Sequence, residues 1–369
     1  MALTRKIWGF SLAGAALTAA GTALARASRQ QRRLIAPIVA PLGLWRPLEA
    51  EKSHRVGVVY NPAKVGSTRA AEVVQERIAQ LGWPAPTLVA TSIESPGTAQ
   101  ARELAASGHT LVIAIGGDGT VGSVARGLLN NPQVSMGIIP AGTGNLLARN
   151  LYLPIADLAR SVDIALNGVA VPMDAINLQT LAPSGISSEH TFFVMSGAGF
   201  DAQVMNDTSE ELKAQIGWLA YAHTGLRGLV GKSPAVRISI EGRDPIETHM
   251  KSVLIANCGR LQGGLQLANL ADLNDGQLEV IVTSPRTLIG WSMVFAKVMR
   301  RTILGSAPEK LPFMQHYMGT SVRIEMLDGP QPVEIDGDIV GHATSLSAQV
   351  LPEVLRVQAH PDVLSFVRL

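Results

Sequence analysis

The chain has 369 residues, of which 47% are hydrophobic and 16% are charged, and its formal net charge is +2. These values exclude a disordered chain and leave room for two folded domains. A single cysteine, Cys258, excludes an internal disulfide framework and a zinc site built on several cysteines. The charge is uneven, because residues 1–55 hold nine Lys/Arg and only two Asp/Glu. A basic arm on a mildly acidic body argues against a nucleic-acid partner and favours an anionic membrane surface.

Residues 1–53 combine an apolar stretch, basic flanks and a linker. Ile7–Ala25 carries no charge and is about long enough to cross a bilayer core at ~1.5 Å per residue. More arginines follow this stretch than precede it, so the positive-inside rule places the body on the cytoplasmic side of the cell membrane. We therefore expect an N-terminal apolar helix that anchors the chain in a single pass or lies on the membrane. A cleaved signal peptide and an ordinary soluble helix are the two alternatives.

Residues 54–170 alternate strand-like and helix-like stretches. Strands are expected at Arg55–Tyr60, Thr87–Thr91, Leu111–Ile115 and Val134–Pro140. Apolar residues at helical spacing separate them, for example Val121, Val124 and Leu128. The alternation predicts an N-terminal doubly wound α/β domain, which binds its ligand at the carboxyl ends of its strands.

Residues 171–353 have a different rhythm, with strand-like runs that follow one another closely. The runs are Val171–Leu178, Thr191–Ser196, Ala235–Ile240, Lys251–Ala256, Leu278–Thr283, Ser321–Met326 and Val333–Ile335. Apolar helical stretches near Ile216–Val230 and Leu288–Met299 interrupt them. This pattern predicts a second, mostly antiparallel β domain. Residues 354–369 form a C-terminal tail, and the sequence leaves open whether it packs on the first domain.

Two strands of the first domain end in glycine loops that precede helices. Gly116–Thr120 (GGDGT) follows one strand, and Gly142–Asn145 (GTGN) follows the next. Glycines let the backbone approach a ligand, and the unpaired N–H groups of a helix start favour a phosphate. A tight turn with Asp118 or Thr120 as a helix cap is the alternative for the first loop alone. Two such loops on one sheet edge favour a phosphate site.

The first loop also matches GxGxxG, the pattern of dinucleotide sites. Such a site expects an acid about 20 residues further on to bind the ribose. No Asp or Glu occurs between Asp118 and Asp157, and the loop follows the third strand instead of the first. A nicotinamide dinucleotide site of this kind is therefore disfavoured.

The ordered motifs resemble the diacylglycerol kinase catalytic-domain family, which includes sphingosine kinases, ceramide kinases and bacterial lipid kinases. Asn61-Pro62, GGDGT and GTGN carry the resemblance, which covers most of the chain from His54 onward. It implies an ATP- and Mg²⁺-dependent lipid kinase, with diacylglycerol as the favoured acceptor. The implied ATP contacts are Asn61, Gly116, Gly117, Asp118, Gly119, Thr120, Gly142, Thr143 and Asn145. A sphingoid base, ceramide, another lipid alcohol or NAD as acceptor stays open, as do a membrane-tethered nucleotide sensor and a homodimer.

Two acidic segments of the second domain complete the resemblance. Asn269–Val280 implies a structural Mg²⁺ held by the Asp275 carboxylate and the backbone oxygens of Asp272 and Gln277, with a metal-free turn as the alternative. Glu334–Asp338 (EIDGD) implies that Asp336 is the general base, although an Asp-Gly sequence is also typical of a type I′ turn. The chain departs from the family pattern at Ser123, Leu146 and Asp338. Asp338, a candidate for secondary Mg²⁺ or ribose contacts, stands where the family carries Glu.

Overall fold

The computed structural model describes residues 53–199, 233–261, 266–268, 272–285, 287–304 and 313–362. The helices expected at Ile7–Ala25 and Ile216–Val230 lie outside these ranges, as does the end of the C-terminal tail. Within these ranges, no helix is both long and apolar enough to cross a bilayer.

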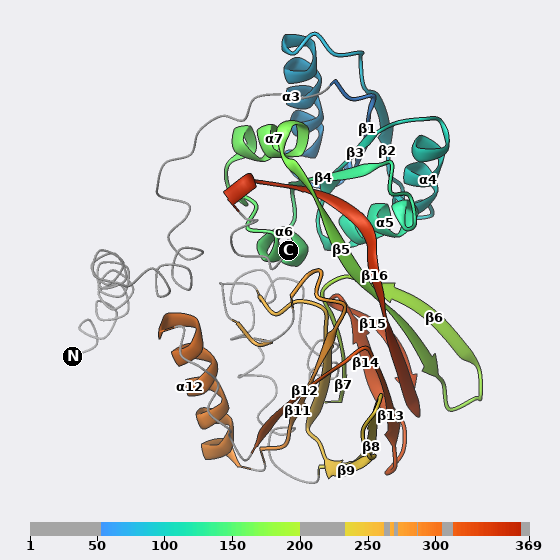
Figure 1. Ribbon diagram of the computed structural model, residues 1–369, viewed down its shortest axis with the longest axis vertical. Helices are drawn as coiled ribbons and strands as arrows, with labels where there is room; N and C mark the ends of the chain where they lie inside the picture. Colours follow the sequence, from blue (N-terminus) through green and yellow to red (C-terminus); the bar gives the residue numbers. More distant parts are fainter. Residues whose placement is uncertain are drawn as a thin grey trace, which may run out of the picture.

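The N-terminal part alternates strands and helices as expected. Its elements are β1 (Val56–Tyr60), α3 (Ser67–Gln80), β2 (Thr87–Ala90), α4 (Thr98–Ala106), β3 (Leu111–Gly116), α5 (Asp118–Leu128), β4 (Ser135–Pro140), α6 (Leu146–Asn150) and α7 (Leu158–Asn167). The strands are parallel in the order β2-β1-β3-β4. Buried residues of α3 and α7 pack on one face of this sheet, and those of α4, α5 and α6 pack on the other (Figure 1). The doubly wound α/β domain is therefore confirmed.

The C-terminal part is built almost entirely of antiparallel strands. Its elements are β5 (Val169–Leu181), β6 (Ser187–Phe192), β7 (Met195–Gly199), β8 (Ala235–Ile240), β9 (Ile246–His249), β10 (Ser252–Ala256), β11 (Leu278–Thr283), α12 (Leu288–Leu304), β12 (Met314–Gly319), β13 (Ser321–Met326), β14 (Gln331–Ile335), β15 (Asp338–Ala343) and β16 (Ser345–Ala359). Six strands form a sheet in the order β12-β11-β10-β7-β14-β15. Its apolar face packs on β5, β8, β13 and β16 through one buried cluster that includes Phe192, Ile238 and Val280. The antiparallel β domain is also confirmed.

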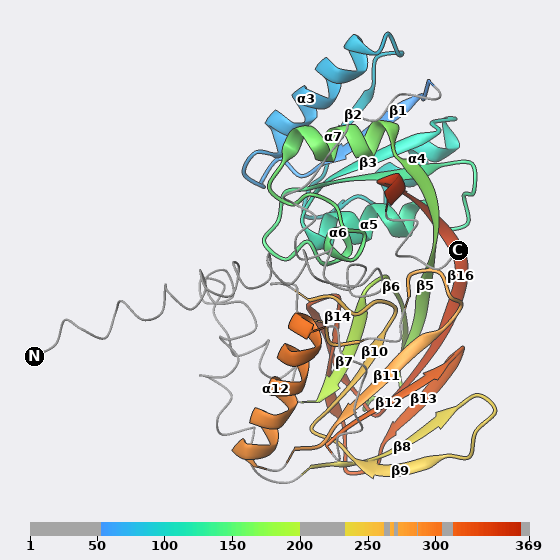
Figure 2. The ribbon, with the colours of Figure 1, turned by 60° about the vertical axis from the view of Figure 1, so that its left-hand side comes forward.

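The two parts share one sheet, because β5 and β16 run from one part into the other (Figures 1 and 2). Val357 of β16 pairs in parallel with Met136 of β4, and most of β16 pairs in antiparallel with β5. The same β16 continues as the neighbour of β13 in the β part. The two parts are thus joined by hydrogen-bonded backbone.

The sequence pattern is wrong at Thr191–Ser196, which it predicts to be one strand. The chain instead leaves β6 after Phe192 and enters β7 at Met195. β6 pairs with β5 in the large sheet, whereas β7 lies between β10 and β14 in the other sheet. Phe193 and Val194 at the break are buried like their neighbours, so apolar periodicity cannot reveal it. The break leaves backbone N–H groups without strand partners.

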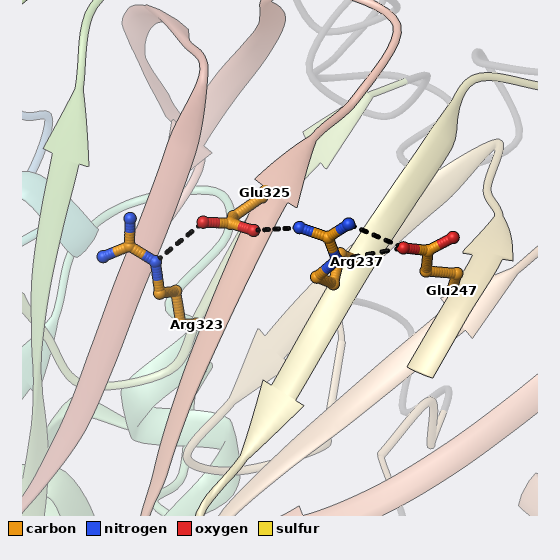
Figure 3. A network of polar contacts seen from close by, with 4 residues as sticks. All are labelled: Arg237, Glu247, Arg323 and Glu325. Atoms are coloured by element: carbon orange, nitrogen blue, oxygen red, sulfur yellow. Dashed lines mark hydrogen bonds and ion pairs between the residues drawn. The ribbon is translucent and has the colours of Figure 1, made fainter. Parts of the chain in front are cut away.

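A charged network covers the outer face of the β part, across β8, β9 and β13 (Figure 3). Arg237 lies 2.7 Å from a Glu247 oxygen and 3.3 Å from a Glu325 oxygen, and Arg323 lies 3.2 Å from the other Glu325 oxygen. These side chains are largely exposed. Exposed ion pairs of this kind contribute about 0–1 kcal/mol each, so the network suits control substitutions.

Candidate functional site

The predicted nucleotide residues meet at one edge of the parallel sheet. Asn61 follows β1, Gly116–Thr120 end β3, and Gly142–Asn145 follow β4, and these three strands are neighbours. The Asn61 N–H donates to the Ile115 carbonyl at 3.0 Å, and its amide lies 3.5 Å from the Thr120 hydroxyl. The first turn of α5 lies at this edge, and the N–H groups of a helix start have no partners within the helix, which favours an anion.

The glycines of the two loops touch each other or leave open space. A Cβ atom on Gly142 would lie 2.5 Å from the Gly117 Cα, so the loops approach more closely than any side chain allows. A Cβ on Gly116 would lie 2.6 Å from the Thr120 Cβ. Gly119 is exposed and has no atom within 4 Å of its Cβ position. The residues present therefore fit a phosphate chain that lies against Gly119.

Asn145 lies inside the second loop, although the family resemblance places it against ATP. Its φ of 49° is left-handed, and its side-chain oxygen accepts the Gly142 N–H at 3.1 Å. Its amide nitrogen donates to the Gly142 carbonyl at 2.6 Å. The side chain therefore closes the loop, while Thr143 beside it is exposed to the crevice edge.

Asp118 caps a helix, but the helix is α6 and not its own α5. Its two carboxylate oxygens accept the Asn145 N–H at 2.7 Å and the Leu146 N–H at 2.6 Å. Burial raises the pKa of Asp118, against these two hydrogen bonds and the charge of Arg149, which lower it. Asp118 thus joins the two glycine loops to each other.

Asp336 occupies the turn between β14 and β15, as the Asp-Gly pattern of the sequence indicated. The φ angles of 47° at Asp336 and 96° at Gly337 are those of a type I′ turn. The carboxylate accepts the N–H groups of Phe193 at 3.2 Å and of Val194 and Met195 at 3.1 Å. These donors come from the break between β6 and β7, which therefore fixes the orientation of Asp336.

Asp336 also lies across a small pocket from Asp118 of the first glycine loop. Burial raises its pKa to about 6, the three backbone hydrogen bonds lower it, and the charge of Asp118 raises it further. A small pocket separates the two acids, lined by Asp118, Val121, Gly122 and Leu147 of the α/β part and by Phe193, Val194 and Asp336 of the β part. A carboxylate that titrates near neutral pH at such a place suits a general base.

Two basic residues that the sequence analysis missed lie at this crevice. Arg126 of α5 is half-buried and donates to the Ser123 hydroxyl at 3.1 Å and to the Thr191 carbonyl at 3.4 Å. Burial lowers its pKa, and the charges of Asp336 and Asp338 raise it. The Lys64 Cε lies 4.0 Å from the Cβ position of Gly117. The sequence offered one signal for Arg126. Its hydrogen-bond partner Ser123 departs from the family pattern.

The predicted metal loop gathers acidic oxygens. Asp275 accepts the Gln277 N–H at 2.9 Å, and Asp174, another residue missed from sequence, accepts the Gly276 N–H at 2.8 Å. Burial raises the pKa of Asp275 to about 6, and the charges of Asp272 and Asp174 raise it as well. The segment is not a tight hairpin, because β10 ends at Ala256 and β11 begins at Leu278.

An unpaired atom in this loop supports a cation. The side-chain oxygen of Asn274 is buried and has no hydrogen-bond partner among the described residues. In the part of the chain that the structure describes, no three His, Cys, Asp or Glu side chains alone could hold a metal. Backbone oxygens would have to contribute, as in the ligand set of Asp275, Asp272 and Gln277. Hard oxygen donors among acidic side chains fit Mg²⁺.

Comparisons with protein families cover most of the chain. Residues 55–178 match the model of the diacylglycerol kinase catalytic domain. Residues 194–359 match that of the YegS C-terminal NAD kinase beta sandwich-like domain. The second match begins at the break between β6 and β7.

Individual relatives agree with these matches. The chain is 30% identical over 252 residues to a diacylglycerol kinase of Bacillus subtilis, which covers 67% of this chain and 79% of that protein. It is 32% identical over 258 residues to a probable lipid kinase YegS-like protein of Klebsiella pneumoniae, covering 68% and 78%. The crystal structure of a diacylglycerol kinase from Bacillus anthracis superposes with a TM-score of 0.62 at 20% identity, covering 85% of this chain and all of that one. This last likeness shows the fold alone.

Proposed function

The chain belongs to the diacylglycerol kinase catalytic-domain family, and on that premise we propose that it phosphorylates the free hydroxyl of diacylglycerol to give phosphatidic acid. As a member of the family it is a lipid kinase, and its family implies ATP as the phosphoryl donor. The acceptor, the identity of the base and the use of Mg²⁺ are our proposals.

The observation that carries the proposal is the pocket between Asp118 and Asp336. Phosphoryl transfer needs a donor phosphate and an acceptor hydroxyl in line, with a group to take the hydroxyl proton. The glycine loops on one side suit the phosphates, and Asp336 on the other suits the proton. In the proposed step the acceptor oxygen bonds to the γ-phosphorus, the bond to the bridging oxygen breaks with its electron pair going to ADP, and the proton passes to the Asp336 carboxylate.

The other residues of the crevice hold these groups in place. The first turn of α5 and Gly117 bind the phosphate oxygens through backbone N–H groups. Asp118 keeps the second loop against the first through its two hydrogen bonds. The three N–H groups at the β6–β7 break hold the Asp336 carboxylate in place at the pocket. Mg²⁺, when bound with ATP, neutralises phosphate charge.

A panel of acceptors tests the proposal. Transfer from γ-labelled ATP is measured with diacylglycerol, a sphingoid base, ceramide, a polyprenol and NAD. We expect labelled phosphatidic acid as the main product. Labelled NADP with no lipid product would contradict the lipid acceptor, and a preference for a sphingoid base or ceramide would move the substrate within the family.

Substitution of the base gives the second arm of the test. Asp336→Asn should reduce turnover by several orders of magnitude and leave ATP binding intact, because Asn keeps the shape but cannot accept the proton. Unchanged turnover would remove Asp336 from its role. ATP binding without turnover of any acceptor by the wild type would favour the nucleotide-sensor alternative.

We also propose that residues 1–53 hold the protein on anionic membranes, on the strength of their excess of Lys/Arg. The chain should sediment with vesicles rich in phosphatidylglycerol more than with phosphatidylcholine vesicles. A full-length variant with Arg26, Arg29, Arg32 and Arg33 changed to Gln should lose that difference. A variant that keeps the wild-type preference for the phosphatidylglycerol vesicles would rule out the basic flank.

A further inference from the structure

Arg126 brings a positive charge to the edge of the pocket between Asp118 and Asp336. Its guanidinium lies 3.4 Å from the Cβ position of Gly122, and Gly122 itself lines the pocket. A side chain at position 122 would therefore press on the guanidinium. Gly122 and Arg126 lie one turn apart on α5. The absence of a side chain at Gly122 leaves space for the guanidinium beside the pocket.

The guanidinium is oriented but not neutralised. It donates to the Ser123 hydroxyl and the Thr191 carbonyl, which are both uncharged. It makes no ion pair within 4.0 Å with any acid among the described residues, although it feels the charges of Asp336 and Asp338. The same positive charge lowers the pKa of His190 on β6, after the larger effect of burial. A half-buried guanidinium with five N–H donors, of which two are used by residues that the structure describes, has capacity for an anionic ligand.

The position of Arg126 selects which anionic group it would meet. The first glycine loop, Gly116–Thr120, lies at the start of α5, and the phosphates that precede the transferred group are expected there. Arg126 instead lies in the last turn of α5, hydrogen-bonded to Thr191, and it feels the charge of Asp336, across the gap where the acceptor hydroxyl is expected. The group that crosses this gap is the phosphoryl group itself, and it carries its charge on three outer oxygens.

We propose that Arg126 contacts an oxygen of the phosphoryl group during its transfer, on the side of the pocket where the acceptor hydroxyl binds. This inference rests on the phosphoryl-transfer function proposed above. The contact strengthens as the group leaves ADP and approaches Asp336, so it lowers the barrier more than it tightens ATP binding. A planar guanidinium suits phosphoryl oxygens better than an ammonium group does.

Kinetics of three variants test the contact. Arg126→Gln should lower kcat about 100-fold, and Arg126→Lys about tenfold, while KM for ATP stays within about threefold. Arg237→Gln removes an arginine from the exposed network of Figure 3 and should behave as wild type. A kcat for Arg126→Gln within threefold of wild type would overturn the proposal. So would a parallel loss of ADP affinity, because that result describes a general nucleotide contact.

A binding measurement separates this inference from the choice of acceptor. ADP with Mg²⁺ is titrated with and without aluminium fluoride, which mimics the transferring phosphoryl group. Wild type should bind ADP more tightly with the fluoride, and Arg126→Gln should lose that gain while it binds ADP alone normally. An equal gain in both proteins would overturn the contact. If no lipid is phosphorylated but the gain still depends on Arg126, the acceptor proposal fails and the contact stands. If Arg126→Gln does not fold, Arg126→Lys is judged by the same gain.

Discussion

Replacing Gly142 with alanine should push the two glycine loops apart and destroy nucleotide binding. The new Cβ would lie 2.5 Å from the Gly117 Cα, whereas ordinary contact begins at 3.4 Å, so the backbones must separate by about 0.9 Å. That movement strains the hydrogen bonds that join the two loops, from the Ala141 N–H to the Gly116 carbonyl and from the Asn145 and Leu146 N–H groups to Asp118. We expect a loss of about 1–3 kcal/mol in the free energy of unfolding. A displacement of ~1 Å in a positioned site costs about 100-fold, which we expect in ATP affinity.

Gly119→Ala is the matched comparison, because its Cβ position has no neighbour within 4 Å. An alanine there should leave the free energy of unfolding unchanged or raise it by about 0.5–1 kcal/mol, since Gly119 lies in α5. It should still weaken ATP binding at least about tenfold, because the methyl group occupies the space assigned to the phosphates. Calorimetric titration with ATP and urea unfolding of both variants measure the two effects. Wild-type ATP affinity in Gly119→Ala would refute the cradle, and normal stability in Gly142→Ala would refute the steric reasoning.

Three further predictions concern the acids. The pKa of Asp336 near 6 lies above that of the unfolded chain, so it contributes stability below about pH 4 that is lost as the pH rises through 6, by up to about 3 kcal/mol. Urea unfolding should show a smaller pH dependence in Asp336→Asn than in wild type, because Asp275 still contributes in both, and kcat/KM should fall as the pH drops below 6. Asp118→Asn keeps one acceptor for the N–H groups of α6 and should lower the free energy of unfolding by about 1–2 kcal/mol. An unchanged urea midpoint would show that Asp118 does not stabilise α6 as a cap. Mg²⁺ should raise the melting temperature of wild type but not of Asp275→Asn, and an equal rise in both would place the metal elsewhere.

The sequence predicts the α/β part well because local and global signals agree there. Leu111–Ile115 is wholly apolar and becomes the central parallel strand β3, buried on both faces. Ala235–Ile240 alternates as a half-buried strand does and becomes β8. In contrast, β15 and β9 carry polar and glycine residues, so their pairing depends on partners that lie elsewhere in the chain. Sequence periodicity has no access to such partners.

The site is predictable where a backbone conformation demands a residue type. Gly142 is required by the contact of the two loops, and the Asp336-Gly337 turn requires left-handed φ angles. The donors to Asp336 could not be foreseen, because backbone N–H groups are the same in every residue. Their availability follows from the break at Phe193 and Val194, which an apolar run conceals. Arg126 was concealed in a different way, because a lone arginine on an amphipathic helix is typical of a solvated face.

The contacts of Asp118 explain how an acid can lie among glycines that we propose to bind phosphate. A carboxylate beside a triphosphate should repel it, but both of its oxygens are engaged by N–H groups of the second loop, and Arg149 adds a positive charge nearby. Its negative charge has a second effect, since it raises the pKa of Asp336 across the pocket. One residue therefore both assembles the two loops and helps to set the proton affinity of the proposed base. If so, Asp118→Asn should move the acid limb of kcat/KM below pH 6 in the activity that remains, whereas loss of the cap alone would reduce turnover and leave that limb in place.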